Sequence, residues 1–298
     1  MILAAGLTPA WQQILVFDQF KDGEVNRASQ AVWCASGKVL NVGCALHHFG
    51  APSHTLSFAG GLPGQALRDD FTRLKVPATW IETSTPSRVC TTILDRQRNI
   101  TTELVENAAA VTAEELSAYR RAFIDLAKES ERIVLSGSLP AGTPAGYYRS
   151  LIESVIESVS CPVLLDFRGD DLRECLSLKP WLVKPNRAEL AATVGEPLVT
   201  EADLLAAMQQ LRTAGAEFVV VSDGPHAVWV AGSKGVSRFH PPVIEAVNPI
   251  GCGDCLAAGL AIAWHQGRRW DDAIEWAIGL AAENARHLLP ARFSPSSS

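Results

Sequence analysis

From about residue 110 onward, short apolar runs alternate with longer segments in which apolar residues recur every three or four positions. The short runs have the length of buried strands, and the longer segments have the period of helices. We predict strands at residues 133–135, 163–166, 181–184 and 218–221 and an edge hairpin at 228–231 and 236–239. We predict helices at residues 112–130, within 144–159, and at 188–194, 201–214 and 271–288. Such alternation predicts an α/β fold with a mostly parallel sheet flanked by helices on both faces.

The first 110 residues have a more polar pattern. We predict strands at residues 2–7, 14–17 and 55–59 and helices at 40–49 and 67–74. The segments 89–94 and 101–105 are typical of two strands joined by a polar turn, and they are too polar for a core sheet. We therefore predict a small separate β lid from about residues 11–36 and 86–105. No repeat or linker divides residues 1–298, which predicts a single domain carrying this lid, with a disordered tail at 294–298.

The composition argues against several classes of protein. With 47% hydrophobic and 19% charged residues, 298 residues are enough for a sizeable core. The net charge of −6 and the lack of a long Lys/Arg block argue against nucleic acid or an anionic membrane as a partner. No apolar run is long enough to span a bilayer, and the first residues lack the basic region of a signal peptide. The seven cysteines are scattered, which favours a cytoplasmic protein, and we interpret Cys252 and Cys255 as small packing residues because no second pair completes a zinc site.

One short stretch combines two glycines with an acidic residue. Gly251-Cys252-Gly253-Asp254 precedes an apolar, Ala-rich segment that we predict to be a buried helix. The glycines let backbone N–H groups approach a ligand, and the first turn of a helix attracts an anion. The Asp254 carboxylate would there be suited to take a proton from a hydroxyl that attacks a phosphoryl group. The alternative is an ordinary glycine turn in which Asp254 caps the helix.

Residues 248–254 resemble the C-terminal signature of the ribokinase-like (PfkB) carbohydrate kinases, whose core is Gly-x-Gly-Asp. The resemblance covers essentially the whole chain and implies a ribokinase-like fold and the use of ATP. It also implies that Asp254 is the catalytic base, and that the N–H groups of Gly251, Cys252 and Gly253 cradle the transferring phosphoryl group.

A second motif follows the predicted strand 181–184. Lys184, Asn186 and Glu189 match the family's Lys-Pro-Asn-x-x-Glu motif. The match implies that Lys184 and Asn186 bind the nucleotide, and that Asn186 and Glu189 hold waters around Mg²⁺, which keeps several of its waters in proteins. The same spacing is that of a capping box, in which the two residues only cap a helix.

Two further loops follow predicted strands, at the edge where open parallel sheets bind ligands. Ser138 lies in a Ser-Gly-Ser-Leu-Pro loop that resembles a family loop near the sugar, although a plain turn is the alternative. Ser222 and Gly224 lie in a loop that resembles one packed near the nucleotide.

The segments that resemble the family's sugar site depart from its pattern. Gly37 and Asn41 are kept from the family's Gly-Gly-Lys-Gly-x-Asn loop, but Ser36 and Val39 replace two of its glycines. Gln12 stands where the family usually has an Asp that binds sugar hydroxyls, and its amide forms hydrogen bonds but carries no charge. The lysine after Gly37 does not belong to a P-loop, because no glycine stands five residues before Gly37.

Arg27 and Arg88 lie on the predicted lid. They resemble lid arginines of the phosphofructokinase, 1-phosphofructokinase and tagatose-6-phosphate kinase branch, which help to bind the phosphate already on the sugar; the guanidinium fork suits phosphate. The alternative is that both are solvated surface residues. Lid sheets of this family often pair between subunits, so the resemblance also implies a homodimer through the lid.

We therefore predict ATP-dependent phosphorylation of a small-molecule sugar phosphate. Two alternatives remain: a kinase of an unphosphorylated sugar or nucleoside, and a nucleotide- or sugar-binding regulator without turnover. The departures at Gln12, Ser36 and Val39 are the reason for keeping the second.

Overall fold

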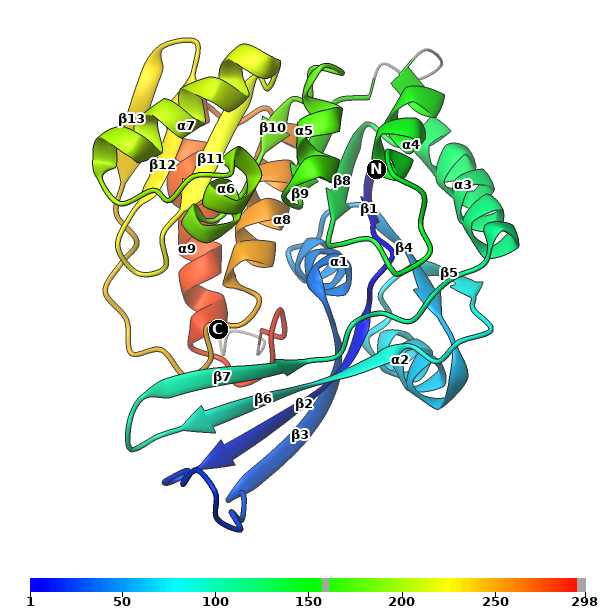
Figure 1. Cartoon of the computed structure of the whole chain (residues 1–298), viewed down its shortest axis with the longest axis vertical. Helices are drawn as coiled ribbons and strands as arrows, with labels where there is room; N and C mark the ends of the chain where they lie inside the picture. The colour runs from blue at the N-terminus through cyan, green and yellow to red at the C-terminus, as the bar shows by residue number, and fades with distance from the viewer. Residues whose placement is uncertain (157–160, 294–298) are drawn as a thin grey trace.

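A computed structural model describes residues 1–156 and 161–293 of the chain. Within them, a nine-stranded sheet has the order β13-β12-β11-β10-β9-β8-β1-β4-β5 (Figure 1). Neighbouring strands from β5 to β11 are parallel, and β12 and β13 add an antiparallel hairpin at one edge. The strands are β1 (Ile2–Ala5), β4 (Ser53–Ala59), β5 (Ala78–Glu82), β8 (Arg132–Ser136), β9 (Val163–Asp166), β10 (Leu182–Val183), β11 (Phe218–Ser222), β12 (Val228–Gly232) and β13 (Gly235–Phe239).

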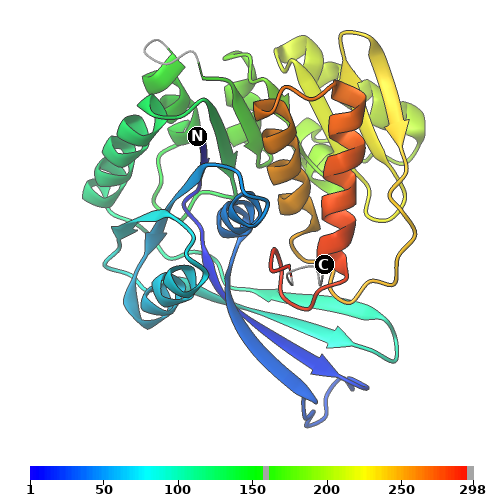
Figure 2. The ribbon, with the colours of Figure 1, turned by 180° about the vertical axis from the view of Figure 1, so that it is seen from behind.

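Helices cover both faces of this sheet (Figures 1 and 2). One face carries α3 (Ala113–Lys128), α4 (Tyr147–Ile156), α5 (Asp170–Leu176), α6 (Arg187–Val194) and α7 (Glu201–Ala214). The other carries α1 (Lys38–His48), α2 (Gly61–Leu74), α8 (Cys252–His265) and α9 (Trp270–Ala285). The predicted fold class, a mostly parallel sheet between two helical layers, is confirmed.

The strand β1 shows why its residues form a central strand. All four of its side chains are apolar and fully buried. Because successive side chains of a strand point to opposite faces, Leu3 and Ala5 join the core on the α3 side, whereas Ile2 and Ala4 join the core on the α8 side. A strand buried on both faces is typical of a parallel sheet with two helical layers.

A second sheet has four strands in the order β3-β2-β6-β7 and extends away from the large sheet (Figures 1 and 2). Its strands are β2 (Ala10–Phe17), β3 (Gln30–Ser36), β6 (Arg88–Asp95) and β7 (Ile100–Val105). One face carries a small apolar cluster of Ile14, Val16, Cys34 and Leu94, against which Leu288 and Leu289 from the end of the described chain pack. We call this face the inner face and this sheet the lid sheet.

Several elements differ from the pattern-based prediction. The strand β2 begins at Ala10, four residues before the predicted start, because its buried residues alternate with partly exposed ones and include the polar Gln12. The short edge strand β5 and the seven-residue helix α5 were not predicted, since neither is long enough to show a period. The predicted helix within 144–159 corresponds to α4, Tyr147–Ile156. Residues 157–159 of that prediction and the predicted tail 294–298 lie outside the described residues.

No helix in the described ranges, 1–156 and 161–293, combines the length and the apolar character needed to cross a membrane.

Candidate active site

The carboxyl ends of the parallel strands meet at one edge of the large sheet, and the lid sheet lies across that edge (Figure 1). Strands β8, β9 and β11 end in Ser136, Asp166 and Ser222, and Lys184 directly follows β10. Open parallel sheets bind ligands at this edge. The helices α1 and α8, which pack against each other, begin close to it, as the contacts described below establish.

The turn before α8 is built around Gly251, whose φ of +85° is left-handed. A Cβ there would lie 2.8 Å from Cβ of Pro290, so both the backbone conformation and the space require glycine. The carbonyl oxygen of Ile250 accepts a hydrogen bond of 2.8 Å from the side chain of Asn284, which holds the turn from α9. Among the described residues no side chain caps α8, so its first turn keeps its affinity for an anion. The N–H of Cys252 makes only a long bond of 3.3 Å, to the carbonyl oxygen of Pro249.

Asp254 lies in the first turn of α8, and only 7% of its surface is exposed. Its Oδ2 accepts a hydrogen bond of 2.7 Å from Nδ2 of Asn41 on α1. Burial raises the pKa of Asp254 to about 6 and the nearby Asp166 adds to this, although Lys38, Asn41 and Lys184 oppose it. A buried carboxylate whose pKa lies near neutral pH is suited to act as a general base.

Two lysines converge on Asp166, which is fully buried. The Nζ atoms of Lys38 and Lys184 lie 3.0 and 3.3 Å from its Oδ1. Burial alone would raise the pKa of Asp166, but Lys184 and Lys38 outweigh it and keep that pKa low. A Cβ on Gly253 would lie 3.4 Å from Nζ of Lys184, so this ammonium group stands beside the start of α8. With Glu189, which also contacts Lys38, and Asp254, the cluster holds three carboxylates and two lysines, so its affinity for a further anion depends on the uncapped N-terminus of α8.

Glu189 serves two partners at once. Its Oε2 accepts from the backbone N–H of Asn186 at 2.9 Å, and Asn186 Oδ1 accepts from the N–H of Glu189 at 2.8 Å, so the two form a capping box at α6. Its Oε1 accepts a hydrogen bond of 2.8 Å from Nζ of Lys38. The capping role and a position in the charged cluster are therefore compatible.

The residues predicted to surround the sugar lie where the lid sheet joins the large sheet. Gly37 has a φ of +89°, and a Cβ there would lie 3.0 Å from the carbonyl oxygen of Thr8. Gln12 is buried in the lid sheet, where its Nε2 donates to Oγ1 of Thr92 at 2.8 Å. The side chain of Thr8 donates to the carbonyl oxygen of Ser138 at 3.1 Å, which ties the two segments together.

The two predicted lid arginines have different surroundings. The guanidinium group of Arg88 donates to the carbonyl oxygens of Thr8, Pro9 and Glu106 at 3.0 to 3.3 Å, at the base of the lid sheet. Arg27 is exposed in the loop between β2 and β3, which forms the far tip of the lid sheet (Figure 1). Arg27 is therefore not brought together, within one chain, with the Asp254 cluster, by which we mean Asp254 and the neighbouring Lys38, Asn41, Asp166, Lys184 and Glu189.

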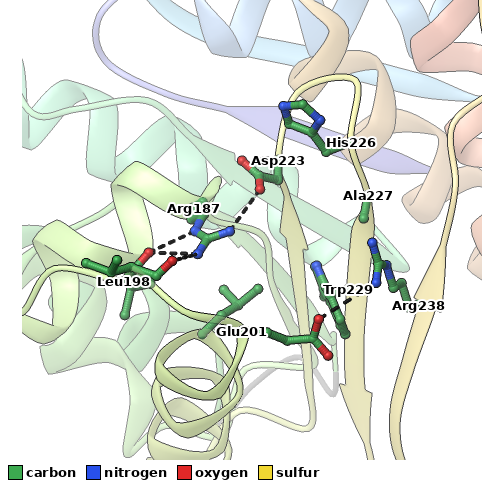
Figure 3. Close-up of a pocket in the computed structure, with 10 residues that line it drawn as sticks. Arg187, Leu198, Glu201, Asp223, His226, Ala227, Trp229 and Arg238 are labelled. Carbon is green, nitrogen blue, oxygen red and sulfur yellow. Dashed lines mark hydrogen bonds and ion pairs between the residues drawn. The ribbon is translucent and has the colours of Figure 1, made fainter.

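The loop with Ser222 and Gly224 is fixed from two sides. Ser222 makes a parallel bridge with Asn186, and Asp223 forms an ion pair of 3.1 Å with Arg187. Arg187 also lines a hollow of about 550 Å³ with Asp223, and Figure 3 shows its guanidinium group turned toward Asp223 and the carbonyl of Leu198. This hollow contains none of the Asp254 cluster, so it borders the predicted nucleotide loop but is not the centre of the chemistry.

Asp166 lies in none of the sequence motifs, and the sequence analysis assigned no role to Lys38 or Asn284. Asp166 was visible only as the last residue of a predicted strand, and Asn284 only as a polar residue in a predicted helix. Lys38 was considered only as a P-loop lysine. The available signal for Asp166 was its place at the carboxyl end of a buried strand, where polar side chains face ligands.

Comparison with known proteins identifies the family. Residues 9–295 match the pfkB family of carbohydrate kinases. A tagatose-6-phosphate kinase of Staphylococcus epidermidis is 30% identical over 264 residues, which cover 88% of this chain and 84% of that protein. The chain belongs to the pfkB family of carbohydrate kinases, as predicted from its motifs, and is a sugar kinase that uses ATP as a substrate.

Solved structures of similar proteins agree with the fold. Phosphofructokinase-2 from Escherichia coli, solved with potassium, superposes with a TM-score of 0.88 at 23% identity and covers 99% of this chain and 96% of its own. A possible 1-phosphofructokinase from Thermotoga maritima also gives a TM-score of 0.88, at 22% identity, and covers 97% of this chain and 93% of its own. At this identity the likeness concerns the fold.

Proposed function

We propose that this chain transfers the γ-phosphoryl group of ATP to a hydroxyl group of a sugar phosphate, with Asp254 as the base. The observation that carries the proposal is the buried Asp254 carboxylate, with a pKa of about 6, in the uncapped first turn of α8. A relative that is 30% identical to this chain is a tagatose-6-phosphate kinase. In this proposal residues 1–298 form one kinase domain, and the lid sheet is its lid.

In this mechanism Asp254 takes the proton of the acceptor hydroxyl as its oxygen attacks the γ-phosphorus of ATP. A bond forms from this oxygen to phosphorus, and the bond between phosphorus and the β-γ bridging oxygen breaks, so that ADP leaves with the electron pair. The N–H groups at Gly251–Gly253 and the ammonium groups of Lys38 and Lys184 stabilise the charge on the transferring group. Losing one such donor typically lowers kcat about 10²- to 10³-fold.

The nucleotide is proposed to lie along Lys184, Asn186, Ser222 and Gly224, which the bridge between Asn186 and Ser222 keeps together. Mg²⁺ would be held through waters by Asn186 and Glu189, where it would neutralise charge on the phosphates. The donor set fits, because Mg²⁺ binds oxygen ligands and needs few from the protein. Lys38 contacts Glu189, so its ammonium group and the ion would share that carboxylate.

The phosphate already on the sugar is proposed to be bound by Arg88 and by Arg27. Three of the five N–H groups of Arg88 are used by carbonyl oxygens, which leaves two to donate and fixes the guanidinium plane. Arg27 stands at the lid tip and would come from the second subunit of a dimer.

The outer face of the lid sheet, opposite the inner face, supports such a dimer. The register places Trp33, Leu104 and Ile100 on this face, and all three are exposed. A four-stranded sheet with apolar residues on both faces is stabilised when a second copy covers the open one. We propose a homodimer in which two outer faces pack together.

The test of the function is ATP consumption by the purified chain across fructose 1-phosphate, fructose 6-phosphate and tagatose 6-phosphate, with free fructose, ribose and nucleosides as controls. The proposal predicts that a phosphorylated sugar has the highest kcat/KM. A kinase of an unphosphorylated sugar is the second candidate, favoured by the carbonyl contacts of Arg88. If a free sugar or nucleoside gave a higher kcat/KM than every sugar phosphate, the chain would be a kinase of an unphosphorylated substrate instead.

A further inference from the structure

We propose that Ser36 is a positioning residue for the Asp254 base, and that it acts through the side-chain amide of Asn41. This inference rests on the proposed role of Asp254. Ser36 stands where the family usually has glycine, so its hydroxyl is a feature of this chain rather than of the motif.

The three side chains form a continuous chain of hydrogen bonds. Oγ of Ser36 donates to Oδ1 of Asn41 at 3.1 Å, and Nδ2 of Asn41 donates to Oδ2 of Asp254 at 2.7 Å. All three residues are buried. The chain connects the end of β3 and the adjoining first turns of α1 with the start of α8, which lies 213 residues beyond Asn41 at Asp254.

The hydroxyl of Ser36 stabilises the orientation in which the Asn41 amide donates to the carboxylate. The amide has one accepting oxygen and one donating nitrogen, of similar size. The charged Asp254 carboxylate only accepts, so it takes the amide nitrogen, and the Ser36 hydroxyl donates to the amide oxygen that faces it in this orientation. Without that hydroxyl, the amide oxygen loses its donor, and rotation of the amide would set an oxygen against the carboxylate of Asp254, where only a protonated Asp254 forms a hydrogen bond.

The backbone before Ser36 is itself held in place, so the hydroxyl is fixed before substrate binds. The N–H of Ala35 donates to Oδ2 of Asp70 at 2.8 Å, and the carbonyl oxygen of Ala35 accepts from Arg292 at 3.0 Å. Arg292 and Asp70 also form a buried ion pair of 3.1 Å. Asp70 on α2 and Arg292 near the end of the described chain therefore fix the backbone segment that carries Ser36.

Removing the Ser36 hydroxyl changes only one of the groups that act on Asp254. The titratable and charged groups that face its carboxylate are Lys38 on α1, Asp166 at the end of β9, Lys184 after β10, and Cys252 and Cys255 on α8. None of these contacts Ser36 in the hydrogen bonds described. Because an amide donor favours the charged carboxylate, destabilising the donating orientation of Asn41 raises the pKa of Asp254.

The experiment compares Ser36→Ala and Ser36→Gly with the matched control Ser57→Ala, whose buried hydroxyl donates to the carbonyl oxygen of Gly6 at 2.9 Å. The first measurement is a ¹³C NMR titration of the aspartate carboxyl groups, with the Asp254 signal assigned by its absence in Asp254→Asn. We expect both Ser36 variants to raise the pKa of Asp254 by about 0.5 to 1 unit, and Ser57→Ala to leave it unchanged.

The second measurement is the pH profile of kcat/KM. We expect the acid limb to move upward by the same amount, so that the Ser36 variants lose about fivefold in activity below pH 6 and little at pH 8, with KM for ATP unchanged. An unchanged Asp254 pKa in both Ser36 variants would overturn the inference. The titration does not depend on the substrate, so it decides the inference even where the sugar-phosphate assignment fails in the kinetic panel.

Discussion

Asp254 is buried beside a second carboxylate, and this environment makes the native state less stable when Asp254 is charged. Its pKa lies at about 6 in the folded chain and near 3.9 in an unfolded one. The contribution of Asp254 to the free energy of unfolding is therefore most favourable below pH 4, and it is lost as the pH rises through about 6. The two lysines and Asn41 limit this cost but do not remove it.

Asp254→Asn should accordingly raise the melting temperature at pH 8, where the native carboxylate is charged, and change it much less at pH 4. The reason is that the amide keeps the shape and can still accept the bond from Asn41 without a buried charge. Differential scanning calorimetry at the two pH values tests this. A lower melting temperature at pH 8 would mean that the Asp254 charge stabilises the fold.

Replacing Arg88, which we propose to bind the sugar phosphate, distinguishes a sugar-phosphate kinase from a kinase of unphosphorylated sugars. Arg88→Ala should raise KM for the sugar phosphate about 10- to 150-fold, the effect of losing a charged hydrogen bond of roughly 1.5–3 kcal/mol, and leave KM for ATP unchanged. The control is Arg96→Ala, an exposed lid arginine paired with Asp18. Equal sugar-phosphate KM values for the two variants would speak against a phosphate site at Arg88.

Gln12 is expected to matter less than the Asp that the family usually has there. Its Nε2 is already bonded to Thr92, so it offers a substrate mainly its oxygen. Gln12→Asp should be tolerated, because the Thr92 hydroxyl can donate to a carboxylate, and it should change the preference among sugars in the same kinetic panel. Loss of folding in this variant, seen by circular dichroism, would show that the amide is needed for the lid sheet itself.

Among the elements, two helices begin with the same capping box, but only one of the two boxes lies in the candidate active site. Thr112 and Glu115 cap α3, and Asn186 and Glu189 cap α6, each with both reciprocal hydrogen bonds. Only Glu189 also contacts Lys38. Comparing variants of Glu115 and Glu189 therefore distinguishes an effect of helix capping from an effect on the active site.

Glu189→Gln should raise the Mg²⁺ concentration needed for half-maximal activity and lower kcat, with little loss of stability, because glutamine still fits a capping box. Glu115→Gln is the matched control, for which we expect unchanged kinetics. The Mg²⁺ dependence of the rate and the thermal melting curve are measured for both. If Glu189→Gln lost stability but kept its Mg²⁺ dependence, its role would be capping alone.

Elements with a local signal could be predicted from the sequence, and contacts across long distances could not. The capping boxes, the Gly251 turn and the buried strands each depend on neighbouring residues. The cluster of Lys38 with Asp166 joins residues 128 positions apart, and its existence depends on how strands and helices are ordered in the sheet. Ser36 and Gln12 were recognised as departures from a family pattern, but their partners Asn41 and Thr92 follow only from the fold.

In the proposed homodimer, the lid sheet would connect the subunit interface with the candidate active site. Its inner face packs on Leu288 and Leu289, and the side chain of Asn248 donates to the carbonyl oxygen of Leu288 at 2.8 Å, next to the Gly251 turn. Its outer face leaves Trp33 and Leu104 exposed. A dimer through the outer face would stiffen the lid and bring the partner's lid tip to the site.

Light scattering of the wild-type chain should therefore give the mass of a dimer. Leu104→Glu should give a monomer with a raised KM for the sugar phosphate, because a charge at the centre of an apolar interface is costly. Val243→Glu, which puts the same charge on a fully exposed apolar residue elsewhere, should remain dimeric. A wild-type monomer with full activity would contradict the lid dimer.

The most direct test of the account is the turnover and ATP affinity of Asp254→Asn. If Asp254 is the base for phosphoryl transfer, kcat with the best substrate of the panel should fall at least about 10³-fold. The dissociation constant of ATP, measured by calorimetry in the same buffer, should stay within about twofold of the wild-type value, because the anion-binding turn at Gly251–Gly253 is unchanged. Retention of more than a few per cent of the wild-type kcat would contradict the assignment of Asp254 as the base.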